Sequence, residues 1–174
     1  KDWDSRPAPQ VISEGVGSAI LKSVEWAPSM RAMDFGAGTG LISSHVAPHV
    51  EKIWAVDVSE AMLSELGSKT NLQGNVIMSA MALHHVSDIP TLLERFSENL
   101  GPGGILALAD LDAEDGTFHP PGIEGVFHFG FDRRQLQERL ESAGFENCRF
   151  ETAVEVHKDG HTFPVFLLTA NKRG

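Results

Sequence analysis

The stretch Met33-Asp34-Phe35-Gly36-Ala37-Gly38-Thr39-Gly40 decides the fold expected for this chain of 174 residues. An apolar run ending in an acid passes directly into a glycine-rich turn, and a helical pattern follows from Leu41 to about Val50. Glycines allow a backbone loop to approach a ligand closely. We therefore predict a buried strand over Ala32–Phe35, whose carboxyl end opens onto a nucleotide-type cofactor at the first strand–helix turn of an α/β sheet.

The rest of the chain alternates between strand-like and helix-like patterns. Strands are expected at 53–57, 76–81 and 105–111, and helices at 11–26, 59–67, 88–100 and 132–144. Two further strands, 148–156 and 163–170, close the chain and are joined by a hairpin turn at Asp159-Gly160. This alternation predicts a doubly wound, Rossmann-like and mostly parallel sheet, with helices on both faces and an antiparallel strand from the C-terminal hairpin.

One connection is shorter than this architecture requires. A doubly wound sheet of about seven strands places a third strand and its connection between the helix ending near Gly67 and the strand at Val76. Residues 70–78 leave no room for them. We expect that the third strand is absent from this sequence, and we favour an omission near Asn75/Val76 over a genuine loss.

Composition narrows the class of protein. The length fits one domain over residues 1–174, with an N-terminal segment and helix at 1–28. Fourteen basic residues against 24 acidic residues give a net charge of −10, which argues against nucleic acid as a partner. The sequence has no apolar run long enough to predict a membrane span. The single cysteine, Cys148, fits a reducing, cytoplasmic compartment. The oligomeric state is left open by the sequence.

Two acids at strand ends indicate the kind of cofactor. The glycine spacing differs from the dinucleotide fingerprint Gly-x-Gly-x-x-Gly, because the residue three positions after Gly38 is Leu41. Asp34 would sit awkwardly beside a pyrophosphate and suits a cationic group instead. Asp57, at the end of the next strand, can accept hydrogen bonds from ribose hydroxyls.

The combined pattern resembles the class I S-adenosylmethionine-dependent methyltransferases, in particular the small-molecule, ubiquinone-biosynthesis-like group (methyltransferase types 11 and 12). The match spans nearly the whole chain. The matching stretches are Asp34–Gly40, Val56–Ser59 with Met62, Ala82–Val86, Leu100–Gly104 and Ala143–Phe145.

The resemblance implies S-adenosylmethionine as cofactor, S-adenosylhomocysteine as product and a seven-stranded sheet with a reversed seventh strand. Asp34 and the glycine turn would face the methionine part of the cofactor, Asp57 would hold the ribose, and Val58 with Met62 would flank the adenine. The family's acidic residue after the third strand has no counterpart here. The positions implied to bind the cofactor are Asp34, Phe35, Gly36, Ala37, Gly38, Thr39, Gly40, Asp57, Val58, Met62, Ser79, Ala80 and Met81.

Histidines provide the candidates for proton transfer. His84 and His85 follow the strand at 76–81, and either could orient the cofactor or deprotonate an acceptor. His128 lies with His119 in the Gly/Pro/His-rich loop 112–130, where an acceptor pocket or lid is expected. The loop's phenylalanines could equally anchor it to the core. No metal site is expected, because these histidines lack convincing acidic or cysteine partners.

These observations predict methyl transfer from S-adenosylmethionine to a small-molecule acceptor by in-line displacement. Two alternatives remain. A nicotinamide-dependent oxidoreductase is disfavoured by the glycine spacing and by Asp34. A non-catalytic S-adenosylmethionine-binding protein would share every motif above. The sequence does not identify the acceptor molecule or atom.

Overall fold

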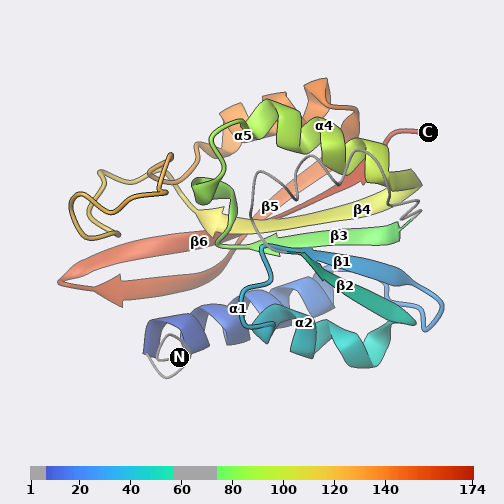
Figure 1. Ribbon diagram of the computed structural model, residues 1–174, viewed down its shortest axis with the longest axis horizontal. Coiled ribbons are helices and arrows are strands. Elements are labelled where there is room, and N and C mark those ends of the chain that lie inside the picture. Colours follow the sequence, from blue (N-terminus) through green and yellow to red (C-terminus); the bar gives the residue numbers. More distant parts are fainter. Residues whose placement is uncertain (1–6, 57–73) are drawn as a thin grey trace.

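The computed structural model describes residues 7–56 and 74–174, which form a six-stranded sheet between two layers of helices (Figure 1). The sheet order is β2-β1-β3-β4-β6-β5. Strands β1 to β4 run parallel, whereas β6 is antiparallel to both β4 and β5. The predicted Rossmann-like sheet is thus confirmed. The strands are β1 (Arg31–Phe35), β2 (Lys52–Val56), β3 (Gly74–Ala80), β4 (Leu100–Leu111), β5 (Phe145–Lys158) and β6 (His161–Lys172).

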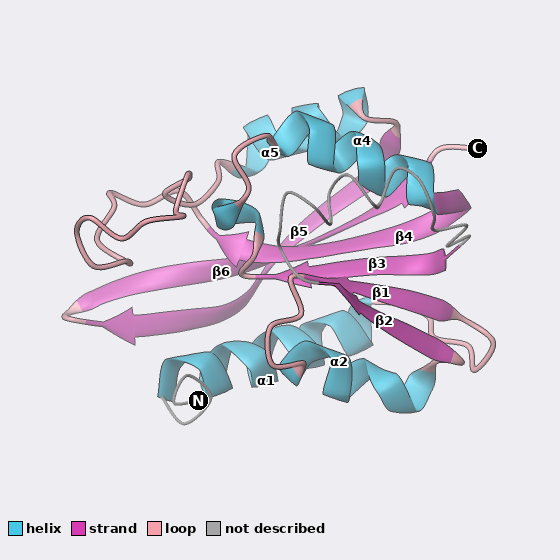
Figure 2. Ribbon diagram, in the orientation of Figure 1, coloured by secondary structure: helices cyan, strands magenta, loops and turns pink. Residues whose placement is uncertain are grey.

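Helices cover both faces of the sheet, as predicted. Helices α1 (Pro7–Ser23) and α2 (Leu41–Val46) lie on one face, and α4 (Ile89–Asn99) and α5 (Arg133–Ser142) lie on the other (Figure 2). Successive side chains of β3 point to opposite faces of the sheet and so contribute to both cores. Ile77 packs in the core beneath α4 and α5, while Val76 and Met78 pack in the core against α1 and α2.

Local sequence signals explain where several elements begin and end. The Asp88 carboxylate accepts a hydrogen bond from the backbone N–H of Thr91 (3.0 Å), and Asp132 caps α5 through the N–H of Gln135 (2.9 Å). At the hairpin tip Asp159 and Gly160 both have positive φ (50° and 78°), as the Asp-Gly turn predicts.

Some predicted bounds were wrong. Helix α2 ends at Val46 rather than near Val50, because Pro48 cannot continue the hydrogen-bond pattern and a 3-10 turn, Ala47–His49, replaces it. Strand β4 begins at Leu100 rather than Ile105, since Leu100 pairs with Gly74 across a register irregularity.

Six strands are present in the described part of the chain, rather than about seven. Strand β2 forms one edge of this sheet. Asn75 and Val76 lie within the single strand β3. The helix expected at 59–67 lies outside the described residues, as does most of the connection that is too short for a third strand, so the omission of that strand stays a prediction.

Candidate functional site

The glycine turn after β1 needs glycine for its backbone shape. Gly36, Gly38 and Gly40 have φ values of 74°, 51° and 82°, in the left-handed region that side-chain-bearing residues rarely adopt. The N–H groups of Gly36 and Ala37 both donate to the carbonyl of Val56, at 2.7 and 3.1 Å, which ties the turn to the end of β2. Within the described part of the chain, a Cβ atom added to Gly38 or Gly40 would meet no atom within 4 Å, so the turn borders space that those residues leave open.

Asp34 places a buried carboxyl group beside that turn. Only 1% of the residue is exposed, and the Ser43 hydroxyl donates to its Oδ2 at 2.6 Å. Burial raises the pKa of Asp34, while the hydrogen bonds from Ser43 act in the opposite direction. A cationic ligand group would compensate the ionised carboxylate, which is the role predicted for Asp34.

A cavity of about 380 Å³ joins the glycine turn to the histidines, and its volume lies in the range of small-molecule sites. Its walls come from α1, the glycine turn, the end of β3, the 3-10 turn Leu83–His85 and the loop after β4. The predicted site residues that line it are Asp34, Gly36, Ala37, Gly38, Thr39, Ala80, Met81, His84 and His85.

The prediction missed the contribution of the first helix to this cavity. Ala8, Pro9, Ile12 and Ser13 of α1 lie in its wall. The sequence signal for α1 was an apolar helical spacing, which does not distinguish a face that packs on the sheet from one that borders a ligand.

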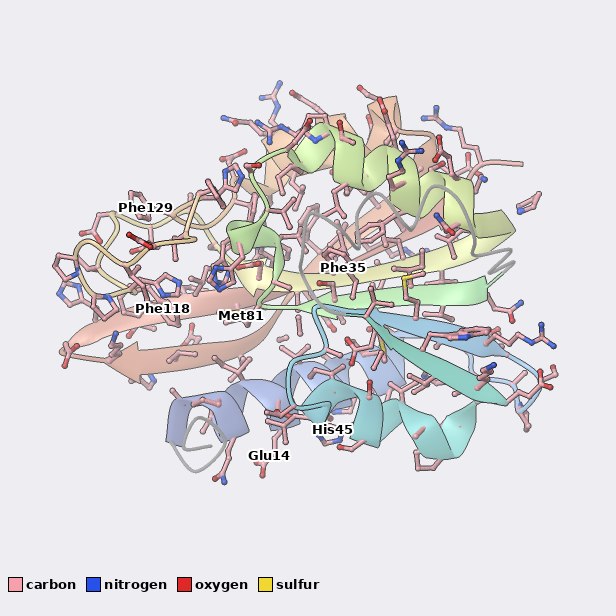
Figure 3. The ribbon with its side chains drawn as sticks, viewed as in Figure 1. Glu14, Phe35, His45, Met81, Phe118 and Phe129 are labelled. Carbon is pink, nitrogen blue, oxygen red and sulfur yellow. The ribbon has the colours of Figure 1, made fainter. Side chains whose placement is uncertain are left out.

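Met81 has a strained backbone at the cavity wall. Its φ of 55° is in the left-handed region although it carries a side chain, and its N–H donates to the carbonyl of Ala109 (2.8 Å). Figure 3 labels Met81 near the end of β3 and Phe118 in the loop that follows β4. Phe118 packs edge-on against Phe163 of β6, with ring centroids 5.2 Å apart, and so fixes the loop side of the cavity.

Three histidine rings gather at the cavity. His84 is 2% exposed, and its ring centroid lies 4.1 Å from that of His85 and 4.9 Å from that of His119. Burial lowers the pKa of His119, and so do the charges of His84, His85 and Lys158. The Nε2 atom of His119 is buried and has no hydrogen-bond partner in residues 7–56 and 74–174. An orphaned polar atom in a cavity wall is suited to meet a polar group of a ligand.

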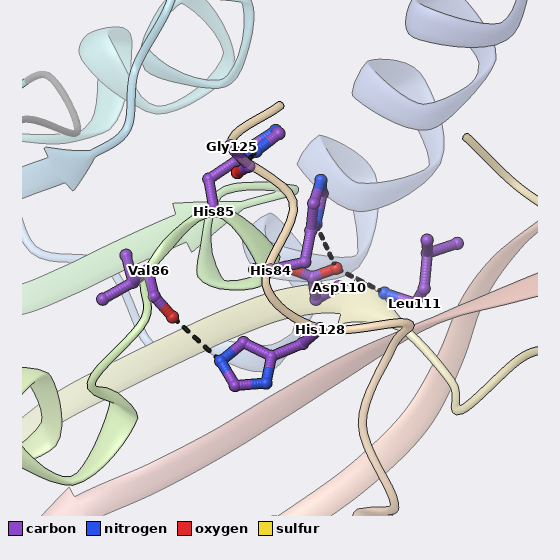
Figure 4. A network of polar contacts seen from close by, with 7 residues as sticks. All are labelled: His84, His85, Val86, Asp110, Leu111, Gly125 and His128. Atoms are coloured by element: carbon purple, nitrogen blue, oxygen red, sulfur yellow. Dashed lines mark hydrogen bonds and ion pairs between the residues drawn. The ribbon is translucent and has the colours of Figure 1, made fainter. Parts of the chain in front are cut away.

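Asp110 is the residue at this site that sequence reasoning overlooked. It is fully buried near the end of β4, and its Oδ1 lies 2.7 Å from His84 Nδ1 (Figure 4). The available signal was an acid near the carboxyl end of an otherwise apolar strand, the same feature that drew attention to Asp34.

Other predicted site residues lie away from the cavity. The ring of Phe35 packs against that of Phe96, with centroids 5.2 Å apart. Ser79 is buried, and its Oγ has no hydrogen-bond partner in the part of the chain that the structure describes. His128 Nε2 bonds to the Val86 carbonyl (2.9 Å), and its ring packs on Phe131. The predicted site residues Phe35, Gly40, Ser79 and His128 are not among the residues that line the cavity. Asp57, Val58 and Met62 lie outside the described residues.

The loop 112–130 is held at its base and at its first turn. The Arg133 guanidinium forms a two-pronged ion pair with Asp112, at 2.7 and 2.8 Å. The Glu114 carboxylate accepts hydrogen bonds from the N–H groups of Gly116, Thr117 and Phe118. These contacts set the positions of Phe118 and His119 in the cavity wall.

Within residues 7–56 and 74–174, no helix is long and apolar enough to cross a membrane. The same ranges contain no group of three His, Cys, Asp or Glu residues placed to hold a metal ion.

Comparison with known proteins places this geometry in a family. Residues 18–149 match the family model described as a methyltransferase domain. An uncharacterised methyltransferase from Schizosaccharomyces pombe is 30% identical over 154 residues. The match covers 68% of this chain and 54% of that protein, so the chain spans about half the length of this relative.

Solved structures share the fold. The YcgJ protein from Bacillus subtilis has a TM-score of 0.70 at 14% identity, covering 92% of this chain and 99% of that one. Haemonchus contortus phosphoethanolamine N-methyltransferase 2, solved in complex with S-adenosylmethionine, has a TM-score of 0.68 at 15% identity. That match covers 91% of this chain and 52% of the nematode enzyme.

Proposed function

The chain belongs to the methyltransferase domain family, and on that premise we propose that it transfers a methyl group from S-adenosylmethionine to a small-molecule acceptor by in-line displacement. The observation that carries the proposal is the buried Asp34 carboxylate beside an open glycine turn. A turn with room for a ligand, together with a carboxylate that has no cationic partner among the described residues, suits a donor that bears both an amino group and a sulfonium.

We assign the amino-acid end of the cofactor to Asp34 and to the turn from Gly36 to Gly40. Neither Gly38 nor Gly40 could carry a side chain without backbone strain and loss of the open space beside it. Asp57, which follows directly after β2, is assigned to the ribose by the family resemblance. Val58 and Met62 are assigned to the adenine on the same basis.

The acceptor is assigned to the loop side of the same cavity. Phe118 and His119 face this side, while Ile12 and Leu41 add apolar surface near the glycine turn. A cavity of about 380 Å³ suits a small molecule. The net charge of −10 would oppose binding of a nucleic acid backbone.

The main task of the protein in methyl transfer is to align the acceptor with the methyl group and the sulfur of the donor. S-adenosylmethionine supplies a methyl group that is already activated by the sulfonium. Asp34 and the glycine turn would fix one reactant, and the ring of Phe118 with the imidazoles would fix the other. Holding two reactants in line can lower a barrier by roughly 7–11 kcal/mol relative to a bimolecular reaction in solution.

We also place the protein in the cytoplasm. Its single cysteine, Cys148, has no disulfide partner, and burial raises the pKa of its thiol, so the residue is suited to a reducing compartment and a structural role.

The test measures binding and turnover separately. Calorimetry should show that S-adenosylhomocysteine binds and that NAD(P) does not, and methyl-labelled S-adenosylmethionine should label an acceptor in a small-molecule panel. NAD(P) binding without S-adenosylhomocysteine binding would favour an oxidoreductase. Cofactor binding with no methyl transfer across the panel would favour a non-catalytic binding protein.

A further inference from the structure

A histidine–carboxylate pair joins the 3-10 turn after β3 to the end of β4 (Figure 4), and its histidine, His84, lines the cavity. His84 Nδ1 and Asp110 Oδ1 are 2.7 Å apart, with exposed side-chain fractions of 2% and 0%. The backbone N–H of His84 also donates to Asp110 Oδ2 (3.2 Å), and that of Leu111 donates to Oδ1 (2.8 Å). The carboxylate is therefore fixed by three hydrogen bonds, and its position fixes the imidazole.

The direction of this hydrogen bond determines which ring nitrogen is available. A carboxylate accepts hydrogen bonds, so His84 Nδ1 carries the proton, and Nε2 of the neutral ring has a free lone pair. A buried carboxylate behind the ring also stabilises the imidazolium that forms when Nε2 takes up a second proton.

The other candidate bases lack this arrangement. His85 Nδ1 bonds to the carbonyl of Gly125 (2.7 Å), and His128 Nε2 bonds to the carbonyl of Val86 (2.9 Å). A carbonyl orients an imidazole but brings no negative charge to stabilise its protonated form. In the described part of the chain, His84 alone among the histidines forms an ion pair with a carboxylate.

We propose that His84 is the general base for methyl transfer, that Asp110 is its positioning residue, and that the acceptor is a phenolic or enolic hydroxyl on a mostly apolar body. This inference rests on the proposed function. A neutral amine attacks without prior loss of a proton, whereas a hydroxyl must lose one. An imidazole, with an ordinary pKa of about 6.5, is matched to a phenol near 10 far better than to an aliphatic alcohol.

The proton and electrons balance without another reactant. As the acceptor oxygen bonds to the methyl carbon, the methyl–sulfur bond breaks and sulfur keeps the electron pair. The hydroxyl proton moves to His84 Nε2, and Asp110 balances the charge of the resulting imidazolium. His84 then releases the proton to solvent before the next turnover.

The groups around His84 are compatible with this role. Asp110 faces it from β4, His85 from the same 3-10 turn, and His119 from the loop after β4. Lys158 and Glu114 act on His119 with opposite signs. Burial and nearby positive charge lower the pKa of His119, which lines the cavity, and its Nε2 has no hydrogen-bond partner among the described residues.

The experiment compares two phenols with labelled S-adenosylmethionine. One is 4-ethylphenol, which is largely protonated at neutral pH, and the other is 4-nitrophenol in alkaline buffer, where it is already ionised. His84→Ala should reduce the rate with 4-ethylphenol by about 100-fold or more, as expected for loss of a general base. It should leave the rate with 4-nitrophenolate much less affected, and added imidazole should restore part of the lost rate.

Two further variants complete the series. We expect kcat of wild type with 4-ethylphenol to rise with pH, and Asp110→Asn should flatten this rise, an effect that a purely structural role would not produce. His157→Gln is the matched control, because this histidine is exposed on the C-terminal hairpin and bonds only to Thr162 among the described contacts. S-adenosylhomocysteine titration of each variant reports whether it is folded.

A readout independent of activity is the ring tautomer. Nitrogen-15 spectra of the wild-type histidines should show neutral His84 protonated at Nδ1. The inference is overturned by protonation at Nε2, by equal rate losses with both phenols, by no loss with either, or by S-adenosylhomocysteine binding without methylation of any phenol. Failure of wild type to bind S-adenosylhomocysteine would instead overturn the proposed function.

Discussion

Asp34 has opposite effects on folding and on ligand binding. Because burial raises its pKa, the folded state binds more protons than the unfolded state at pH values between the unfolded and folded pKa. Stability from this group therefore decreases as pH rises through that interval, and the loss persists at neutral pH. The same buried charge is what a cationic ligand group would compensate.

We predict that Asp34→Asn stabilises the ligand-free protein at neutral pH and weakens S-adenosylhomocysteine binding. Loss of one hydrogen bond to a charged group is worth roughly 1.5–3 kcal/mol, or about 10-fold to 150-fold in affinity. In thermal melts across the acid range, the Tm of Asp34→Asn should increase relative to that of wild type as pH rises. Calorimetry should show the weaker binding of S-adenosylhomocysteine.

The matched control for this variant is Asp159→Asn. This residue is exposed at the hairpin tip, and asparagine tolerates its positive φ of 50°. Unchanged S-adenosylhomocysteine affinity in Asp34→Asn would contradict the assignment of Asp34 to the cationic end of the cofactor.

Asp57 is the residue that we assign to the ribose of the cofactor, and this assignment rests on the sequence alone. Asp57→Ala removes the carboxylate proposed to accept hydrogen bonds from the ribose hydroxyls, at roughly 1.5–3 kcal/mol for each bond lost. We expect calorimetry to show that Asp57→Ala binds S-adenosylhomocysteine more weakly than wild type does. The ratio of its affinity for S-adenosylhomocysteine to its affinity for analogues altered in the amino-acid part should be the same as in wild type. Wild-type affinity would mean that the ribose is held elsewhere.

At the scale of elements, the loop 112–130 depends on Glu114. Its carboxylate accepts three backbone hydrogen bonds, from Gly116, Thr117 and Phe118, at 2.8, 2.8 and 3.1 Å. Glu114→Ala should therefore make hydrogen exchange at these amides faster, by roughly 10-fold or more, since bonds to a charged group are worth about 1.5–3 kcal/mol.

The rest of the sheet should hardly respond to this change, because the loop contributes little to either core cluster. Glu155→Gln, an exposed acid on β5, is the control. If exchange at 116–118 stays slow in Glu114→Ala, the loop is held by other contacts, with the Arg133–Asp112 pair and the Phe118–Phe163 packing as the remaining candidates.

The elements that the sequence predicted well are those fixed by local chemistry. Helix starts at Asp88 and Asp132 and the turn at Asp159-Gly160 depend on residues within three positions of each other. The glycine turn was equally local, because Asp34 and the glycines need no partner far along the chain to reveal their pattern.

The features that the sequence did not predict depend on pairing between distant segments. Asp110 meets His84 only because β3 and β4 are neighbours in the sheet, and the two residues are 26 positions apart. The placement of His128 on Val86, away from the cavity, likewise depends on how the loop folds back. The contribution of α1 to the cavity follows from its position beneath the sheet.

At the scale of the whole molecule, ligand binding and stability are linked. A ligand that binds only the folded state stabilises it by about 2.7 kcal/mol when present at 100 times its Kd. For a domain of 150–250 residues each kcal/mol raises the Tm by roughly 2–4 °C. We therefore predict that saturating S-adenosylhomocysteine raises the Tm of this 174-residue chain by about 5–10 °C.

This shift distinguishes the competing cofactors without a known acceptor. NAD(P) at the same excess should leave the Tm unchanged, because Asp34 lies 1% exposed beside the glycine turn, where a pyrophosphate would need to approach. Asp34→Asn should show a smaller S-adenosylhomocysteine shift at the same ligand concentration, since its higher Kd lowers the saturation. Only the folded state brings the glycine turn and the neighbouring Asp34 together, so a rise in Tm reports a ligand bound to the folded protein. A rise in Tm with NAD(P) and none with S-adenosylhomocysteine would therefore assign the cavity to a nicotinamide cofactor instead.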